Sequence, residues 1–594
     1  MKKIGSISII SVIYRLWSHL TLRRRTQFFL LIFLMVICSG ADLISIGLVV
    51  PFLGAFMSPD SLLSNVYINQ AATFFNLNEK DLLIRYITIF FVVSVVISSL
   101  LRILLLWFGV RYSNSTGSEF SIEIYRNTLN KPYLKHIATN TSSVINGVIN
   151  KSNSISSACI TPLLRIFSAI IFCGILIAIL IAINPLLMIA TFLLFAGIYW
   201  FVMVITKGRL EKYGKLMALE STTQIKLLQE GLGGIRDIII NNNQSLFVAL
   251  YGDTDKKLRN ANANHEIIST IPRYIVEPLG VIAIVFFAYY LSLKYQPSVF
   301  IPTLGIIALC AQKMLPMLQQ AYNSWALITG AKYSIIDAIE LMDACIVPDI
   351  KSDLLPIQFN ASIYLGDVSF KYSEDSKDIL SGINLEIKKG QKIGLIGSTG
   401  SGKSTLIDIL MGLFPPTKGH LYIDGFAINS SNVANWQARI AHVPQQVFLS
   451  DASIAENVAF GIPISGIDFQ RVATVGRLSQ IHEFVDRLPK KYLTAVGERG
   501  VKLSGGQRQR IAIARALYRG ADFLVFDEAT SALDSETEKL VMRSISELNT
   551  NITMVMIAHR ISTLENCDLI FELNNGILKK YESYLEMVKI KGIR

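Results

Sequence analysis

The chain has 594 residues, of which 51% are hydrophobic and 17% charged, and a formal net charge of +12. A composition this apolar and weakly charged excludes an ordinary soluble globular protein. Long apolar runs fill the chain up to about residue 330, whereas after about residue 360 the runs are short and separated by charges and turns. The sequence therefore predicts a membrane part followed by a part in water.

The N-terminal segment 1–27 mixes aromatic, aliphatic and basic residues. This mixture is typical of an amphipathic helix that lies in the membrane interface rather than crossing the bilayer. We expect segment 1–27 to be an interfacial helix.

Six apolar stretches follow within residues 28–336, and each is about 20 residues long, enough to cross a hydrocarbon core of about 30 Å. We therefore predict a six-span membrane domain over 28–336. The predicted spans are 28–53, 83–110, 158–183, 185–205, 271–294 and 299–320.

The positive charge is concentrated on one predicted side of the membrane. The connections 110–157 and 206–270 together contain fourteen Lys and Arg, and Arg23, Arg24 and Arg25 precede the first span. The positive-inside rule places these segments and the C-terminal half in the cytoplasm. We read the surplus charge as membrane topology and expect no nucleic-acid partner.

These two connections are too long to be structureless loops. We expect the spans to continue into the cytoplasm as helices joined by tight turns, with a kink or turn near Gly231–Gly234.

A polar linker, 337–360, leads to short apolar strand-like segments that alternate with helix-like segments over 361–594. Such alternation predicts an α/β domain with a largely parallel sheet. The predicted fold class is thus multi-domain: an all-α polytopic membrane domain, with six spans and cytoplasmic helix extensions, followed by an α/β P-loop nucleotide-binding domain.

A phosphate-binding loop follows the strand-like KIGLIG and precedes the helix-like TLIDILMGL. In this pattern glycines let backbone N–H groups surround phosphate oxygens, Lys403 reaches the β- and γ-phosphates, and Ser404 binds Mg²⁺. The residues expected to bind ATP here are Gly397, Ser398, Thr399, Gly400, Ser401, Gly402, Lys403, Ser404 and Thr405.

Four further residues stand where parallel strands are expected to end beside this loop. Asp527 follows the apolar strand FLVF and can hold Mg²⁺, and Glu528 can polarise the attacking water. Gln445 can reach Mg²⁺ or that water. His559 is expected to contact the γ-phosphate.

A second phosphate-binding feature is the turn Ser504, Gly505, Gly506 and Gln507, which opens directly into a helix. Unpaired N–H groups and the positive end of the helix dipole make such a helix start suitable for a phosphate. One nucleotide already enclosed by a P-loop does not need this second feature from the same domain.

Taken together, the P-loop, Gln445, LSGGQ, FLVFDE and the SALD run that ends at Asp534 resemble the ATP-binding cassette of ABC transporters, and the six spans resemble the exporter-type membrane half. The resemblance implies that Tyr372 stacks on adenine. It also implies that the LSGGQ turn and Asp534 face ATP held by a second copy, so that a homodimer hydrolyses ATP and alternates access across the membrane.

Three cations inside the predicted spans suggest the substrate. Arg102, Arg273 and Lys313 interrupt apolar runs, and basic residues in spans usually face a wet cavity or a partner. Pairing of Arg273 with Glu277, at helical i, i+4 spacing, or snorkelling is the alternative. Together the three predict a cavity for an anionic headgroup such as pyrophosphate.

A weaker resemblance points the same way. The early VVPFLGAF, a candidate surface helix in the outward loop 54–82, and IPR…E in the fifth span are similar to bacterial flippases of lipid-linked oligosaccharides. That resemblance implies a protein of the bacterial inner membrane that exports a polyprenyl-pyrophosphate glycan for protein glycosylation or related surface polymers.

Two alternatives remain open. A multidrug or lipid A type exporter shares the architecture and would favour an aromatic, apolar cavity. A soluble or regulatory ABC ATPase would not transport at all, and the six apolar spans argue against it.

Overall fold

The computed structural model describes residues 8–49, 51–52, 80–183, 185–294, 297–343, 357–528, 534–548, 552–557 and 561–591. The chain forms two compact units. The helical unit comprises Met1–Lys131 and Thr139–Val347, and the cassette unit comprises Pro132–Ala138 and Pro348–Arg594. The predicted outward loop 54–82 and the linker 337–360 fall largely outside the described residues.

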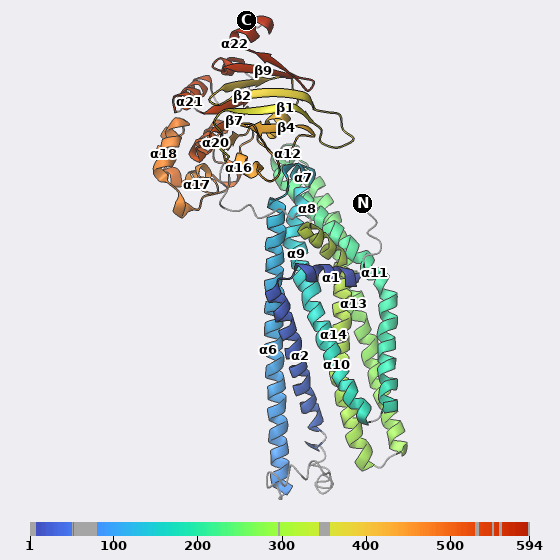
Figure 1. Cartoon of the computed structure of the whole chain (residues 1–594). Coiled ribbons are helices and arrows are strands. Elements are labelled where there is room, and N and C mark those ends of the chain that lie inside the picture. Colours follow the sequence, from blue (N-terminus) through green and yellow to red (C-terminus); the bar gives the residue numbers. More distant parts are fainter. Residues whose placement is uncertain are drawn as a thin grey trace. The chain divides into compact units, whose positions relative to one another are not determined.

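Long helices that run alongside one another build the helical unit (Figure 1). Each of the six predicted spans falls on one of them. They are α2 (Leu22–Gly47), α6 (Lys80–Leu129), α10 (Thr161–Ile183), α11 (Pro185–Gly233), α13 (Gln244–Lys294) and α14 (Pro297–Asp343). Within the described residues, four stretches are long and apolar enough to cross a membrane: Leu22–Gly47, Ile84–Leu129, Thr141–Ala178 and Gln244–Phe286.

Four of these helices are much longer than a bilayer crossing requires. Helices α6, α11, α13 and α14 contain 50, 49, 51 and 47 residues. At about 1.5 Å per residue, 50 residues extend about 75 Å, more than twice the hydrocarbon thickness of about 30 Å. The predicted continuation of the spans as helices is confirmed, and α11 ends at the predicted glycines, where the short α12 (Ile235–Ile240) leads to α13.

Helix α1 (Ile9–His19) lies across the long helices (Figure 1). Val12 and Leu16 pack into the helical unit, whereas Ile10 and Tyr14 are exposed on the opposite side. The predicted amphipathic helix is therefore present, and its position in a membrane interface stays a prediction.

Between α6 and α10 the chain is helical with local irregularities. The elements are α7 (Tyr133–Ala138), α8 (Thr141–Asn146), a π-helical turn (Gly147–Lys151), α9 (Ser152–Ile155) and a second π-helical turn (Ser156–Ile160). Each π turn inserts an extra residue and so rotates the side chains that follow. The first one buries Lys151, whose Nζ pairs with an Asp337 carboxylate oxygen at 2.6 Å.

Helices α11, α13 and α14 meet at one point of very close packing. A Cβ atom on Gly214 of α11 would lie 2.1 Å from the carbonyl oxygen of Gly330 on α14. A Cβ atom on Gly330 would lie 2.1 Å from Nε2 of His265 on α13. Two glycines thus bring three helices together at a distance that any larger side chain prevents.

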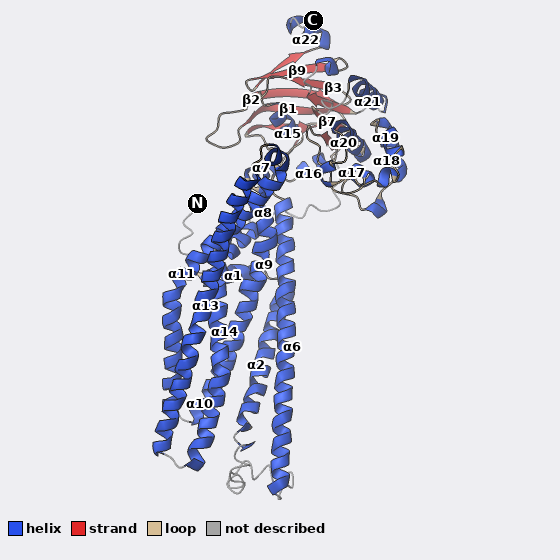
Figure 2. Ribbon diagram, turned by 180° about the vertical axis from the view of Figure 1, so that it is seen from behind, coloured by secondary structure: helices blue, strands red, loops and turns tan. Residues whose placement is uncertain are grey.

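Two sheets form the centre of the cassette unit (Figure 2). The larger has the order β10-β9-β3-β8-β7-β6, and all neighbours pair in parallel except the edge strand β10. Its strands are β3 (Lys392–Ile396), β6 (Ile440–Val443), β7 (Phe523–Asp527), β8 (Thr553–Ile557), β9 (Leu569–Asn574) and β10 (Ile577–Tyr581).

The second sheet is antiparallel, with the order β2-β1-β4-β5. Its strands are β1 (Ser362–Phe370), β2 (Leu380–Lys388), β4 (Lys418–Ile423) and β5 (Phe426–Ala427). The sequence alone does not separate this sheet from the parallel one. The connection 371–379 is too short for the crossover that parallel strands need, which explains the antiparallel pairing of β1 and β2.

Helices surround these sheets and divide the cassette unit into two main regions. The strands and α15 form one extensive core, and α17, α18 and α20 enclose another apolar cluster that includes Ile454, Val472 and Ile511. A third cluster packs α20 against the parallel sheet, through Ala512 and Ile513. The helices are α15 (Lys403–Leu410), α16 (Val433–Gln437), α17 (Ile454–Val458), α18 (Phe469–Leu478), α19 (His482–Asp486), α20 (Gly505–Arg519), α21 (Ser535–Leu548) and α22 (Tyr584–Lys591).

The close approach at Gly214 predicts a specific sensitivity to substitution. Gly214→Ala forces two backbones apart, and we expect a loss of about 1–3 kcal/mol from overpacking, measured as a lower thermal unfolding midpoint of the purified protein. Gly208→Ala is the matched control on the same helix, because nothing lies within 4 Å of its Cβ position. Equal midpoints for the two variants would contradict the close packing.

Candidate functional site

The P-loop connects β3 to α15 in the core of the cassette unit. Gly397 has a φ of 154°, and a Cβ atom there would lie 2.3 Å from the carbonyl oxygen of Leu573, so no other residue fits. Nζ of Lys403 donates to the carbonyl oxygens of Gly397 and Ser398, both at 2.9 Å. The loop is thus closed around its own lysine, which is positioned to meet a phosphate chain.

The other predicted P-loop residues lie in this loop and in the first turn of α15. Oγ of Ser401 is buried without a hydrogen-bond partner, and Gly400 has open space around its Cβ position. These are features of a cradle shaped for a ligand rather than for its own side chains. The residues concerned are Ser398, Thr399, Gly400, Ser401, Gly402, Ser404 and Thr405.

An aromatic cluster lies next to α15. The Tyr372 hydroxyl lies 3.1 Å from Oγ1 of Thr405, and its ring packs edge-on against Phe414 with centroids 5.7 Å apart. Tyr133 of α7 also stacks on Phe414, and the centroids of these two rings are 5.6 Å apart. Burial and the nearby Asp408 carboxylate raise the pKa of Tyr133. Tyr372 is therefore fixed beside the P-loop helix, and its role as an adenine platform stays a prediction.

Acidic residues end β7 at the same sheet edge as the P-loop, because β3, β8 and β7 are parallel neighbours. Glu528 has a positive φ of 51° and its N–H donates to the carbonyl oxygen of Ile557 at 3.2 Å. The Gln445 side-chain amide donates to the Glu528 carboxylate. Two residues far apart in sequence, Gln445 and Glu528, thus meet in one site.

Burial raises the pKa of Asp527, and the Glu528 carboxylate raises it further, while Lys403 opposes both. A divalent cation would favour the ionised form of this carboxylate. Together with the Ser404 hydroxyl and the Gln445 amide oxygen, Asp527 provides the oxygen ligands that Mg²⁺ prefers, so these residues fit the cation. His559, the fourth predicted catalytic or phosphate-sensing residue, lies outside the described residues.

The LSGGQ turn belongs to the other region of the cassette unit. Oγ of Ser504 accepts from the Gln507 N–H at 3.3 Å, and the Gln507 side-chain oxygen accepts from the Ser504 N–H at 2.9 Å. This capping box fixes the start of α20 with Gly505 and Gly506 in the first turn. The preceding Leu503 packs into the cluster formed by α17, α18 and α20 rather than into the core that holds the P-loop.

Asp534 caps the start of α21. Its carboxylate accepts from the Thr537 N–H at 2.8 Å and from the Thr537 hydroxyl at 2.7 Å, and these bonds lower the pKa of Asp534. This is a local role, and contact with a second copy stays a prediction.

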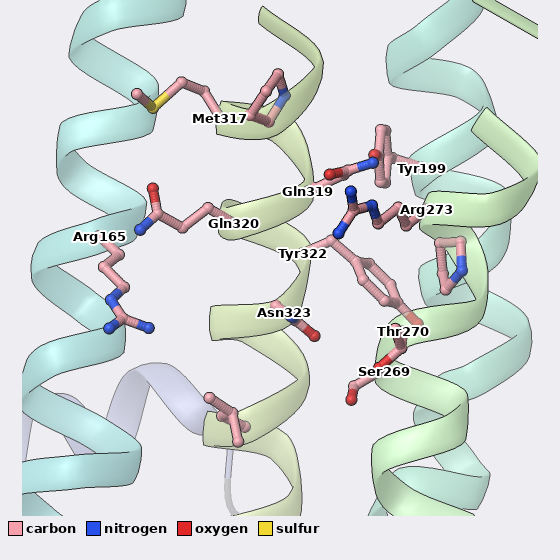
Figure 3. A pocket seen from close by; sticks show the side chains of 13 residues that line it. Arg165, Tyr199, Ser269, Thr270, Arg273, Met317, Gln319, Gln320, Tyr322 and Asn323 are labelled. Atoms are coloured by element: carbon pink, nitrogen blue, oxygen red, sulfur yellow. The ribbon is translucent and has the colours of Figure 1, made fainter. Parts of the chain in front are cut away.

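A pocket of about 370 Å³ with both polar and apolar side chains lies in the helical unit where α10, α11, α13 and α14 converge (Figure 3). Figure 3 shows Arg165 of α10 on one side of α14 and Arg273 of α13 on the other, with the Gln320 amide directed toward α10. The lining residues are Arg165, Tyr199, Ser269, Thr270, Pro272, Arg273, Pro316, Met317, Gln319, Gln320, Tyr322, Asn323 and Leu327.

Pro272 leaves one backbone carbonyl oxygen near the pocket without its usual helical hydrogen bond. Pro272 has no N–H, so the carbonyl oxygen of Ile268 lacks its helical donor, and the Tyr322 hydroxyl donates to it at 3.3 Å. Tyr199, only 5% exposed, has a hydroxyl without any hydrogen-bond partner. The pocket therefore contains a buried polar group available to a ligand.

The two arginines of the pocket differ in their partners. Nε of Arg273 lies 3.5 Å from the Glu277 carboxylate, the pairing that the i, i+4 spacing predicts. Among the described residues no ion pair joins Arg165 to a carboxylate. The pocket thus holds surplus positive charge, which suits an anion.

The other two cations predicted to contact the substrate lie elsewhere. Arg102 forms hydrogen bonds of 2.9 and 2.6 Å with the Asp42 carboxylate, which is 8% exposed and also accepts from Ser98. Lys313 is exposed and does not line the pocket. Arg273 therefore lines a pocket with Arg165, which lies on the other side of α14, and not with these two.

Sequence reasoning missed three residues here. Asp42 stands alone in the apolar run ICSGADLIS, and Arg165 interrupts LLRIF in the same way as Arg102 interrupts SSLLRILLLW, so both were visible as charges within spans. Tyr199 gives no such signal, because a tyrosine in a span is ordinary.

Comparisons with known proteins find similarity in the cassette unit and in the fold of the chain. Residues 380–531 match the protein-family model described as ABC transporter. An "ATP-dependent lipid A-core flippase" of Chromohalobacter salexigens is 39% identical over 238 residues, 40% of this chain and 41% of that protein. The protein of the same name from Cupriavidus metallidurans is 28% identical over 486 residues, 81% of each chain.

The chain spans less than half the length of the first curated relatives, such as the Chromohalobacter protein. A solved structure of a bacterial Atm1-family ABC exporter with ATP bound superposes with a TM-score of 0.79 at 23% identity and covers 96% of both chains. This likeness shows the fold.

The environment of Asp408 in α15 predicts a pH dependence. Burial, and then the Asp527 charge, raise its pKa to about 6, so the folded protein holds this proton more tightly than the unfolded chain. The corresponding stability is complete below 3.8, the pKa of an ordinary aspartate, and is lost as the pH rises through about 6. Asp408→Asn should therefore raise the thermal midpoint of the full-length protein, by an amount that grows from pH 4 to pH 6 and is constant above.

Asp375→Asn removes the same charge at an exposed position and serves as the control, with no such pH-dependent gain expected. A gain from Asp408→Asn that is the same at every pH would show that its carboxyl titrates normally.

Proposed function

Because the chain carries an ABC transporter ATP-binding domain within the fold of a full-length ABC exporter, we propose that it is an ATP-driven exporter of an anionic, lipid-linked molecule. The molecule is moved from the inner to the outer leaflet by alternating access. The more specific substrate we propose is a polyprenyl-pyrophosphate oligosaccharide. The observation that carries this assignment is the pocket lined by Arg165 and Arg273.

The cassette unit has the groups that ATP hydrolysis needs. Glu528, oriented by Gln445, accepts a proton from the attacking water, and Lys403 with the P-loop N–H groups holds the phosphates. Mg²⁺ held by Ser404, Gln445 and Asp527 would neutralise charge on the β- and γ-phosphates. His559 is assigned to the γ-phosphate on sequence grounds.

The separation of the two phosphate-binding features supports a homodimer. The P-loop belongs to the core around β3, whereas the LSGGQ turn belongs to the region of α17, α18 and α20. In a two-fold dimer the LSGGQ turn of one copy, with Asp534, completes the site at the P-loop of the other. ATP then holds the copies together, and hydrolysis separates them.

The substrate assignment rests on charge. A pyrophosphate carries several negative charges and many acceptor oxygens, which match two arginines and the neighbouring amides of Gln319, Gln320 and Asn323. The long apolar helices around the pocket suit a lipid chain. We place the cassette unit in the cytoplasm from the distribution of basic residues. The bacterial relatives support the inner membrane of a bacterium as its location.

A second candidate is a flippase of the lipid A type. The relatives from Chromohalobacter and Cupriavidus carry that name, and lipid A also presents phosphates on an apolar anchor. The same pocket chemistry serves both lipids, so only a comparison of the two substrates separates them.

Replacing the proposed catalytic base tests the ATPase. Glu528→Gln removes the proton acceptor but keeps the hydrogen bond to Gln445, so we expect phosphate release to fall at least about 100-fold while ATP stays bound. The measurement is steady-state phosphate release together with retention of labelled ATP. The exposed Glu483→Gln in the same unit should leave both unchanged. Steady phosphate release from the Glu528 variant would overturn its assignment as the base.

To test the pocket, we would measure the ATPase rate of the protein in proteoliposomes as a polyprenyl-pyrophosphate oligosaccharide is added, and separately as lipid A is added. Each charged hydrogen bond is worth about 1.5–3 kcal/mol, so Arg165→Ala with Arg273→Ala should raise the half-stimulating lipid concentration at least about tenfold. The basal ATPase rate should not change.

The control is Arg259→Ala. Arg259 lies on the same helix as Arg273 and also has an i, i+4 carboxylate partner, Asp255, but it does not line the pocket. Stimulation by lipid A alone would favour the second candidate. Stimulation that survives loss of both arginines would refute the pocket as the headgroup site.

A further inference from the structure

A second cavity in the helical unit, of about 550 Å³, lies between α2 and α6, away from the pocket of Arg165 and Arg273. We define the lipid groove by the residues that matter below: Arg23, Leu30 and Leu34 of α2, and Trp107, Phe108 and Arg111 of α6. We propose that it binds an anionic glycerophospholipid of the cytoplasmic leaflet, with the phosphate at Arg23 and Arg111.

The charges at one end of the groove favour an anion. Arg24, which also lines the cavity, is satisfied by hydrogen bonds of 2.9 and 2.7 Å to Glu119. In the described part of the chain, no carboxylate lies within ion-pair distance of Arg23 or Arg111. Two exposed guanidinium groups thus converge on one cavity without an anion of the protein's own.

The rest of the groove is apolar and open. Leu30 is 62% exposed, and Trp107 and Phe108 are about half exposed. From Arg23 to Leu34 the helix advances about 16 Å, close to half of a hydrocarbon core of about 30 Å. The groove therefore changes from basic to apolar over the length of one lipid leaflet.

The position along the helices fits the membrane interface. Arg111 lies one turn from Trp107 and stacks over its ring at 4.6 Å. Arginine and tryptophan are both enriched where hydrocarbon meets headgroups, and the basic end is the predicted cytoplasmic end. The occupant best matched to this order of chemistry is a bilayer lipid with net negative charge, because a zwitterionic headgroup gains less from two arginines.

The experiment uses the full-length protein in nanodiscs of phosphatidylcholine that contain a minor fraction of either brominated phosphatidylglycerol or brominated phosphatidylcholine. Bromine quenches nearby tryptophan fluorescence, and the difference between wild type and Trp107→Phe isolates the signal of Trp107. We expect phosphatidylglycerol to be preferred over phosphatidylcholine at Trp107 by roughly fivefold per arginine.

Arg23→Gln with Arg111→Gln should make the two brominated lipids quench equally, whereas Arg23→Lys with Arg111→Lys should retain most of the preference. Arg85→Gln, which removes an arginine about 39 Å away along α6, should retain it fully. The ratio between the two lipids within each variant cancels any direct effect of Arg111 on Trp107.

Three results would overturn the proposal: equal quenching by the two lipids in wild type, a preference that persists in the double glutamine variant, or a Trp107 that neither lipid reaches because a second copy covers it. The measurement needs neither ATP nor a transported substrate. Its outcome is therefore independent of the proposed export function.

Discussion

An unpaired positive charge among apolar helices is unfavourable by several kcal/mol, and this constraint organises the helical unit. Most of its interior cations have a protein anion: Arg102 has Asp42, Lys151 has Asp337 and Lys332 has Glu211. Arg165, Arg23 and Arg111 differ from these, because they are exposed and form no ion pair within the described residues. Both proposals rest on the availability of these arginines to an anion from outside.

In the cassette unit, the corresponding requirement is that the negative charges of a triphosphate meet hydrogen-bond donors. A triphosphate needs many donors, and the chain supplies two sets of them, one at the P-loop and one at the LSGGQ turn, whose Leu503 packs with α17, α18 and α20. Each set is rigid by itself, one through a glycine loop closed around Lys403 and the other through the capping box of Ser504 and Gln507.

Sequence reasoning succeeded where the chemistry is local. The P-loop requires its glycines at fixed positions along the chain, and the spans are recognisable by length and hydropathy alone, so both were predictable. The antiparallel sheet was not separated from the parallel one, because strand partners are set by connection length and packing rather than by the strands' own residues. The Arg102–Asp42 pair joins residues 60 positions apart, and nothing in a single sequence says which helix faces they occupy. Arg165 carried the same signal as Arg102 but needed the convergence of four helices to be recognised beside Arg273.

The contact of Gly214, Gly330 and His265 has a mechanical consequence. Backbone lies directly against backbone there, so α11 and α14 cannot slide along each other without collision, and His265 holds α13 against the same point. Arg273 of the pocket lies on α13, about two helical turns from His265. The contact that fixes α13 against α14 therefore also sets the position of Arg273.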